Sequence, residues 1–208
     1  MRVSDDRYNR EMRSFHLALK MLRYEARTNT ICAWTGFTGE RVRNLSKSHR
    51  MDKTDLEAGR HRGPSPRQLG HLLCNSGWRS EISAMAGLCR ALGLIPTQPM
   101  PDARTRLPGI ENGERLCYAF EVFREVVPQA RLTLEQLVLI VFAIAEGKQW
   151  SLGHCTRCRA VILVDHLSVT RHICAYCDKE LRAGNAAERG ALVETDLDRE
   201  TAVQQTLF

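Results

Sequence analysis

The segment HCTRCRAVILVDHLSVTRHICAYC, residues 154–177, contains two Cys-x-x-Cys pairs. Cys155 pairs with Cys158 and Cys174 pairs with Cys177, and 15 residues separate the two pairs. Each pair can present two sulfur atoms from one tight turn, and the intervening segment is long enough for a short hairpin that places the second turn beside the first. Four thiolates at this spacing are typical of a tetrahedral Zn²⁺ site. The sequence therefore predicts one zinc ion per chain.

A set of four cysteines leaves no open coordination position, so we expect the zinc ion to be structural rather than catalytic. The ion should stabilise a lobe that is too small to fold on its own core. Basic side chains surround the cysteines, where they can offset the negative charge of a zinc–tetrathiolate centre and are candidates for contacting phosphate: Arg157, Arg159, Arg171 and Lys179.

Two other interpretations of the cysteine cluster stay open. His154 or His172 could replace one cysteine as a ligand, although each lies outside its pair. A redox-active dithiol is the second alternative, but a thioredoxin-like pair needs a βαβ context that the sequence lacks. The other four cysteines are scattered among apolar residues, and we expect them to be small buried hydrophobic side chains: Cys32, Cys74, Cys89 and Cys117.

The positive charge of the chain is confined to its first third. Residues 1–63 contain 14 Lys and Arg against 8 Asp and Glu, whereas residues 64–208 contain 16 of each. A localised basic surface favours a polyanionic partner, most often nucleic acid. An ordinary solvated basic face is the alternative.

The basic region contains a pattern typical of a helix-turn-helix. We expect a short helix over residues 30–35, a turn at Gly36 and Phe37, and a second helix that begins near Thr38 as its N-cap. Val42 and Leu45 should face inward, which leaves a polar and basic outer face sized for a major groove. The candidate DNA-binding residues of this segment are Thr38, Arg41, Arg43, Asn44 and Lys47.

Helical periodicity dominates the rest of the chain up to residue 147. We expect one helix over residues 5–28, with its apolar stripe on Phe15, Leu19, Leu22 and Ala26. Further helices are predicted over 79–94, 111–127 and 134–146. The last of these is apolar nearly all round, and a capping box of Thr133 and Gln136 marks its start. Strand character appears only at residues 160–164.

These elements predict a mainly α protein with four regions. They are a basic helix-turn-helix-like region (1–63), a helical body with proline-rich loops (64–147), a four-cysteine zinc-ribbon lobe (148–182) and a flexible tail (183–208). The charged N-terminus is unlike a signal peptide, and no apolar run approaches the roughly 20 residues of a membrane span, so we expect a cytoplasmic protein without membrane contact.

The order of these features resembles the FlhC family, the larger subunit of a bacterial flagellar master transcription activator. The similarity covers roughly residues 12–180, and its most specific parts are the four-cysteine spacing and its position near the C-terminus. The segment HRGPSPRQLG, residues 61–70, is similar to the Gly/Ser/Pro-rich linker of that family, and NSGW, residues 75–78, lies near its tryptophan-containing stretch.

The resemblance implies a DNA-binding activator subunit, not an enzyme. It implies a hetero-oligomer with a small helical FlhD-like partner, binding to promoter DNA of flagellar operons, RNA polymerase as a further partner, and zinc held by Cys155, Cys158, Cys174 and Cys177. Related regulators activate transfer genes on conjugative elements, which is an alternative role. A zinc-ribbon scaffold that binds no DNA is the other alternative.

Overall fold

The computed structural model describes residues 5–51, 69–70, 76–167 and 172–183. The predicted loop over residues 51–70 lies almost wholly outside the described residues, as do Cys74, Arg171 and the predicted tail from residue 184 onward. The elements are α1 (Asp5–Arg23), α2 (Thr28–Thr35), α3 (Gly39–Met51), α4 (Ser76–Ala91), α5 (Ala103–Arg106), α6 (Ile110–Val126), α7 (Leu134–Glu146), β1 (Trp150–His154) and β2 (Val161–Asp165), followed by a helical segment over 175–183. The prediction of a mainly α protein with a C-terminal four-cysteine cluster is confirmed.

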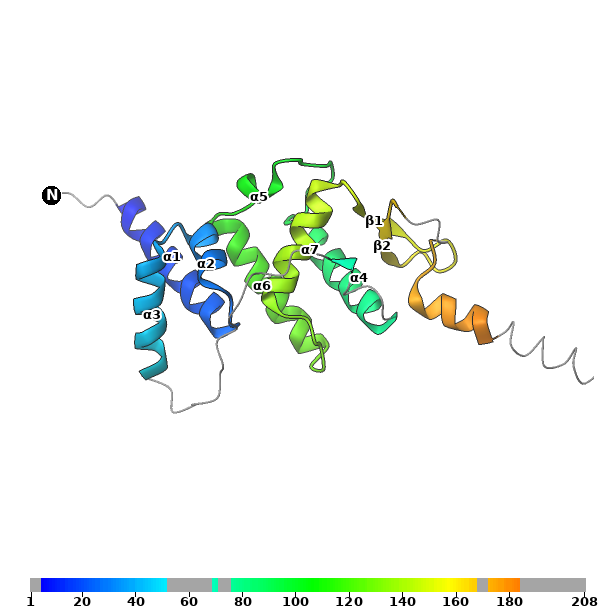
Figure 1. Cartoon of the computed structure of the whole chain (residues 1–208), viewed down its shortest axis with the longest axis horizontal. Helices are drawn as coiled ribbons and strands as arrows, with labels where there is room; N and C mark the ends of the chain where they lie inside the picture. Colours follow the sequence, from blue (N-terminus) through cyan, green and yellow to red (C-terminus); the bar gives the residue numbers. More distant parts are fainter. Residues whose placement is uncertain (1–4, 52–68, 71–75, 168–171, 184–208) are drawn as a thin grey trace, which may run out of the picture.

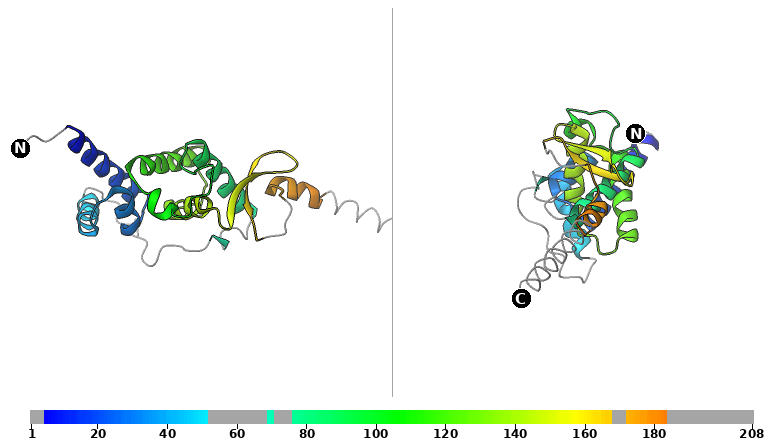
Figure 2. Two further views of the ribbon diagram at one scale, coloured as in Figure 1. Left: turned by 90° about the horizontal axis from the view of Figure 1, so that it is seen from above. Right: turned by 90° about the vertical axis from the view of Figure 1, so that its right-hand side faces the viewer.

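The molecule is elongated, with α1, α2 and α3 at one end and the β1–β2 hairpin at the other (Figure 1). Helices α4, α6 and α7 lie between these ends and form the body. The same separation holds when the molecule is seen from above (Figure 2). One continuous set of buried side chains runs from Leu17 in α1 to Leu163 in β2.

Helix α1 ends five residues before the predicted end at residue 28. Glu25 adopts a left-handed conformation with φ of 57°. The backbone N–H of Ala26 donates to the carbonyl of Met21 at 2.9 Å, and that of Glu25 donates to Leu22 at 3.0 Å. This is the Schellman pattern that closes a helix, and it is most often built on glycine. Because the residue at the left-handed position is a glutamate and not a glycine, the sequence carried no signal for the end of this helix.

The buried face of α1 also differs from the predicted stripe. Leu17, Ala18 and Met21 are almost completely buried, whereas Phe15, Leu19 and Leu22 are only half-buried. Helix α1 packs against α2, α3 and α6, so its most buried line lies between these neighbours. The wider apolar stripe extends from this line toward solvent.

Helix α7 is the centre of the body. The Thr133 side chain accepts from the backbone N–H of Gln136, and the Gln136 side chain accepts from the backbone N–H of Thr133, which confirms the predicted capping box. Ten of the 13 helical residues are buried, as the apolar sequence predicts. Gly147 ends the helix in a left-handed conformation with φ of 66°. Burial of each large apolar side chain stabilises the fold by about 1.5–3 kcal/mol.

Contacts from α7 reach elements at both ends of the described part of the chain. The Phe142 ring packs 6.0 Å from the Trp34 ring of α2. The backbone N–H of Arg27, at the start of α2, donates to the buried Glu135 carboxylate at 2.8 Å. The helix also packs on α4, α5, α6 and β1. Helix α7 therefore connects the basic end of the molecule to the hairpin.

The hairpin is formed differently from the prediction. Strand β2 matches the predicted strand segment, but its antiparallel partner β1 precedes the first cysteine pair, with Trp150 opposite Asp165 and His154 opposite Val161. The segment between the two cysteine pairs supplies only one strand of the hairpin. The expectation of a hairpin wholly inside that segment was wrong, because the first cysteine pair itself forms the turn.

None of the described helices is both long enough and apolar enough to span a membrane. Even α7, the most apolar, has 13 residues, against the roughly 20 that a span requires.

The crossing of α1 and α6 generates a prediction at Gly113. A Cβ atom at Gly113 would lie 2.6 Å from Cδ2 of Leu17, a core side chain that is 1% exposed, so the Leu17 side chain would have to shift. We expect Gly113→Ala to destabilise the protein although alanine is the better helix former by about 1 kcal/mol. Adding Leu17→Ala should remove the clash, so the double variant should lose less stability than the two single losses combined. Urea unfolding measures the free energy of unfolding of the two single variants and of the double variant.

Gly87→Ala is the matched control in α4. Its Cβ would meet Val161 at an ordinary 3.5 Å, so this variant should be neutral or stabilising. Strict additivity of Gly113→Ala and Leu17→Ala would contradict the proposed clash.

Candidate metal centre and basic surfaces

The first cysteine pair lies in the turn between β1 and β2. The backbone N–H of Cys155 donates to the carbonyl of Ala160 at 2.8 Å, and that of Arg159 donates to Cys155 at 3.0 Å. Arg159 has a left-handed φ of 64°. These bonds fold residues 155–160 tightly enough to turn Cys155 and Cys158 toward one point.

The second pair lies at the start of the helical segment over 175–183. Cys174 directly precedes this segment, and its carbonyl accepts from the backbone N–H of Asp178 at 3.0 Å. The N–H of Thr156 donates to the carbonyl of His172 at 2.9 Å. This bond between the two turns holds the second pair beside the first.

The four sulfur atoms converge as predicted. All four Sγ atoms lie within 4.8 Å of one another, and those of Cys158 and Cys174 are 3.6 Å apart. A tetrahedral metal ion with sulfur bonds of about 2.3 Å separates its ligands by about 3.8 Å. Cys155 and Cys177 are buried, whereas Cys158 is exposed. The arrangement fits one metal ion held by four sulfur ligands.

The protonation of the thiols also fits a cation. Backbone N–H groups of Cys158 and Cys174 lower the pKa of Cys155 to about 6, so this thiol ionises first. Burial, together with the neighbouring thiols, raises the pKa of Cys177 to about 12. The Cys155 thiolate thus forms readily, whereas ionisation of Cys177 is unfavourable without a cation. A bound cation would remove that cost and favour the fully deprotonated set.

The other candidate ligands and cysteines take different places. His154 and His172 are exposed, and among the residues that the structure describes the converging group consists of the four cysteines alone. Burial raises the pKa of Cys89 and of Cys117 to about 12, as expected for inert core thiols. Cys32 is half-buried against the core.

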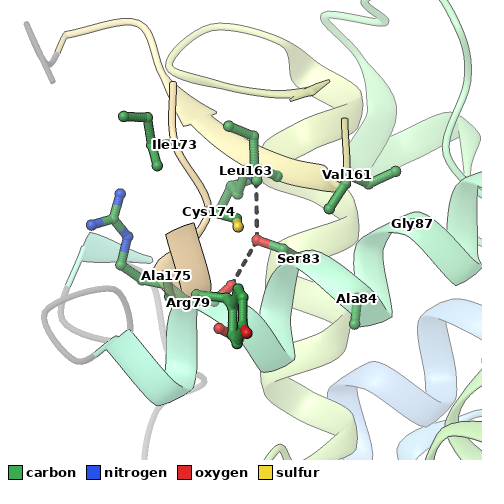
Figure 3. Close-up of a pocket in the computed structure, with 13 residues that line it drawn as sticks. Arg79, Ser83, Ala84, Gly87, Val161, Leu163, Ile173, Cys174 and Ala175 are labelled. Atoms are coloured by element: carbon green, nitrogen blue, oxygen red, sulfur yellow. Dashed lines mark hydrogen bonds between the residues drawn. The ribbon is translucent and has the colours of Figure 1, made fainter. Parts of the chain in front are cut away.

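Ser83 of α4 attaches the cysteine lobe to the body, and no pattern in the sequence pointed to this residue. Its buried hydroxyl donates to the carbonyl of Arg79 at 2.6 Å and accepts from the backbone N–H of Leu163 at 3.1 Å (Figure 3). Serine within a helix commonly bonds back to the preceding turn. The second bond, to a strand 80 residues away, had no signal in the local sequence.

The α2–α3 segment follows the predicted pattern closely. Gly36, with φ of 74°, ends α2, and the Thr38 hydroxyl accepts from the backbone N–H of Arg41 at 3.3 Å as the N-cap of α3. Val42 is completely buried and Leu45 half-buried. The predicted DNA-binding side chains are exposed: Thr38, Arg41, Arg43, Asn44 and Lys47. Whether they contact DNA stays a prediction.

Arg41 differs from the other side chains of this face because it is engaged within the molecule. Its guanidinium pairs with Glu11 of α1 at 2.7 Å and lies 4.1 Å from the centre of the Phe37 ring. These contacts hold α3 against α1 and make Arg41 less available to a partner than Arg43 or Lys47.

The basic residues of the cysteine lobe are at the opposite end of the molecule. Arg157 and Arg159 are exposed, and Arg157 lies 3.8 Å from the Glu180 carboxylate. Arg171 lies outside the described residues. Helix α3 and the lobe therefore present two separate basic surfaces rather than one (Figure 1).

We expect Cys174→Ser to lower the metal content of the purified protein from about one equivalent to less than half. The reason is that one of four sulfur ligands is lost, together with the N–H···S bond that Cys174 Sγ accepts from the backbone N–H of Cys177 at 3.4 Å. Elemental analysis measures the effect. Cys32→Ser is the control and should keep the metal, because Cys32 lies on α2, at the end of the molecule away from the cysteine lobe. Full metal content in Cys174→Ser would contradict the four-sulfur site.

We expect Ser83→Ala to loosen the lobe on α4 and to cost about 1–3 kcal/mol, since the buried N–H of Leu163 loses its acceptor. Hydrogen exchange at Leu163 should accelerate. Ser48→Ala is a matched control, because Ser48 donates to the carbonyl of Asn44 in the same way but on an exposed face. Equal effects of the two substitutions would show that the bond to Leu163 contributes nothing.

The four-sulfur group can thus hold a metal ion in a closed ligand set, and two exposed basic surfaces flank the body. Comparison with protein-family models finds no match to this chain, and comparison with curated proteins finds none either.

Proposed function

We propose that the protein is the DNA-binding subunit of an FlhC-like transcription activator and that its metal is one structural zinc ion. Four sulfur ligands in a tetrahedral spacing favour zinc among the common metals. Because a closed ligand set leaves no position for a substrate, it supports a non-enzymatic role.

The observation that carries the proposal is the exposed face of α3. Arg43, Asn44 and Lys47 are exposed on a helix that follows a short helix and a glycine turn. Arginine and asparagine are the side chains that bind guanine and adenine edges through two hydrogen bonds, whereas lysine mainly contacts phosphate. In this proposal Arg43 and Asn44 contact bases, and Lys47 contacts the backbone.

The lobe supplies a second DNA contact in this proposal. Arg157 and Arg159 lie at the far end of the elongated body from α3 (Figure 1). A promoter that touched both surfaces would follow the long axis of the molecule. Each phosphate neutralised by a basic side chain adds to the salt dependence of binding.

A small helical FlhD-like protein is the proposed partner, in the cytoplasm, with RNA polymerase as a further partner of the complex on promoters. Exposed apolar side chains on two helices support a protein partner: Tyr8 and Met12 on α1, and Tyr118 and Val126 on α6. Contiguous apolar patches mark surfaces that another protein covers, and in this proposal these side chains belong to such a patch.

The test is a DNA-binding titration in which the two basic surfaces are changed separately. We expect Arg43→Ala to weaken promoter binding by about 1–3 kcal/mol and to relax sequence preference. Lys47→Ala should weaken all DNA alike and lower the salt slope by about one. Replacing Arg157 and Arg159 together should lower the slope without changing sequence preference.

Arg106→Ala serves as the control, since this arginine is exposed on α5, away from both surfaces. Upstream regions of flagellar and of conjugative-transfer genes are the two DNA probes. The probe that the protein binds with higher affinity indicates which of the two roles it has. If all variants and the wild type lack salt-dependent DNA binding, the activator proposal is wrong and the scaffold alternative is favoured. If only the lobe variant loses sequence preference, the lobe and not α3 recognises the bases.

A further inference from the structure

A cleft lies between helix α4 and the cysteine lobe, and no role described above uses it. Its volume is about 480 Å³, within the range of roughly 300–1,000 Å³ that small-molecule sites occupy. One face of α4, strand β2 and the start of the segment over 175–183 form its walls (Figure 3). Helix α4 and the cysteine lobe, about 80 residues apart in the sequence, thus enclose one space.

The cleft is hollow because the facing side chains of α4 are small. Ala84 and Gly87 lie on this face of the helix, and Val161 of β2 packs against Gly87 (Figure 3). Ile173 and the Tyr176 ring complete an apolar lining on the lobe side. Tyr176 is 70% exposed and Val161 39%, so large apolar groups at the rim are left in contact with water.

Charge is present at one place in this lining. Arg79 is the single charged residue among the described residues of the cleft, and it forms no ion pair with any of the residues that the structure describes. Its guanidinium extends toward the end of the cleft where Ile173 lies (Figure 3). An apolar groove with a cation at its end complements a molecule with an apolar body and an anionic head.

We propose that this cleft binds a small amphiphilic carboxylate, an alkyl chain of medium length whose head group pairs with Arg79. The chain lies along Ala84, beside Tyr176, and ends where Val161 packs against Gly87. Because opposite walls belong to the body and to the cysteine lobe, such a ligand bridges the two in the same way as the Ser83–Leu163 hydrogen bond. The proposal does not depend on DNA binding.

Calorimetric titration of the full chain with octanoate tests the proposal, with octanamide as the uncharged probe of equal length. We expect saturable binding of octanoate at one site per chain and at least about tenfold weaker binding of octanamide, since a charge-assisted pair is lost. Arg79→Gln should weaken octanoate to the level of octanamide and leave octanamide unchanged. Arg10→Gln, an exposed arginine on α1, should change neither.

Ala84→Leu fills the cleft from an exposed position of α4 and should abolish binding of both probes. Ala91→Leu is its control, on the same helix but outside the lining, and should bind both normally. Circular dichroism and metal content establish that each variant is folded. In the wild type, octanoate should also slow hydrogen exchange over residues 160–163 and 173–176, which locates the site without any substitution.

Three outcomes overturn the proposal. The first is the absence of saturable octanoate binding in the wild type. The second is equal affinity for the two probes, or binding that survives Ala84→Leu, because the ligand then lies elsewhere or its charge is not recognised. The third is a change of oligomeric state caused by Ala84→Leu without ligand, measured by light scattering, since a second copy of the chain would then occupy the cleft.

Discussion

Burial of α7 on all sides is the constraint on which the rest of the fold depends. A 13-residue helix with ten buried residues needs neighbours around its whole circumference, and α2, α4, α5, α6 and β1 provide them. The buried Glu135 carboxylate at its start accepts from the backbone at the beginning of α2. Because a buried charge is costly unless it is hydrogen-bonded, this contact fixes where the α2–α3 segment joins the body.

The two ends of the molecule depend on α7 in different ways. At the basic end, Trp34 of α2 packs on Phe142, and Arg41 then holds α3 against α1 through Glu11. At the other end, β1 packs on α7 while β2 bonds to Ser83 of α4. The cysteine lobe has only a few buried side chains of its own, so its stability comes from this docking together with the metal that its thiols can bind. Loss of either should leave the helical body intact.

Local signals in the sequence were reliable where a few neighbouring residues decide the conformation. The capping box of Thr133 and Gln136, the turn at Gly36 and the N-cap Thr38 were all predicted from short patterns and are all present. The end of α1 was missed because Glu25 occupies a left-handed position that is usually glycine. Strand β1 was missed because a five-residue strand with a half-buried pattern has little periodicity to detect.

Periodicity and Cys-x-x-Cys spacing act over a few residues, so they were sufficient to predict a mainly helical protein and the four thiols of a metal site. The packing of whole elements was needed to show that the first cysteine pair forms the turn of the β1–β2 hairpin and that the two basic surfaces lie at opposite ends. This packing also creates the cleft beside Arg79, whose walls come from α4 and from the cysteine lobe. Such contacts join residues as far apart as Ser83 and Leu163, and their partners are set by how whole helices pack rather than by any local pattern.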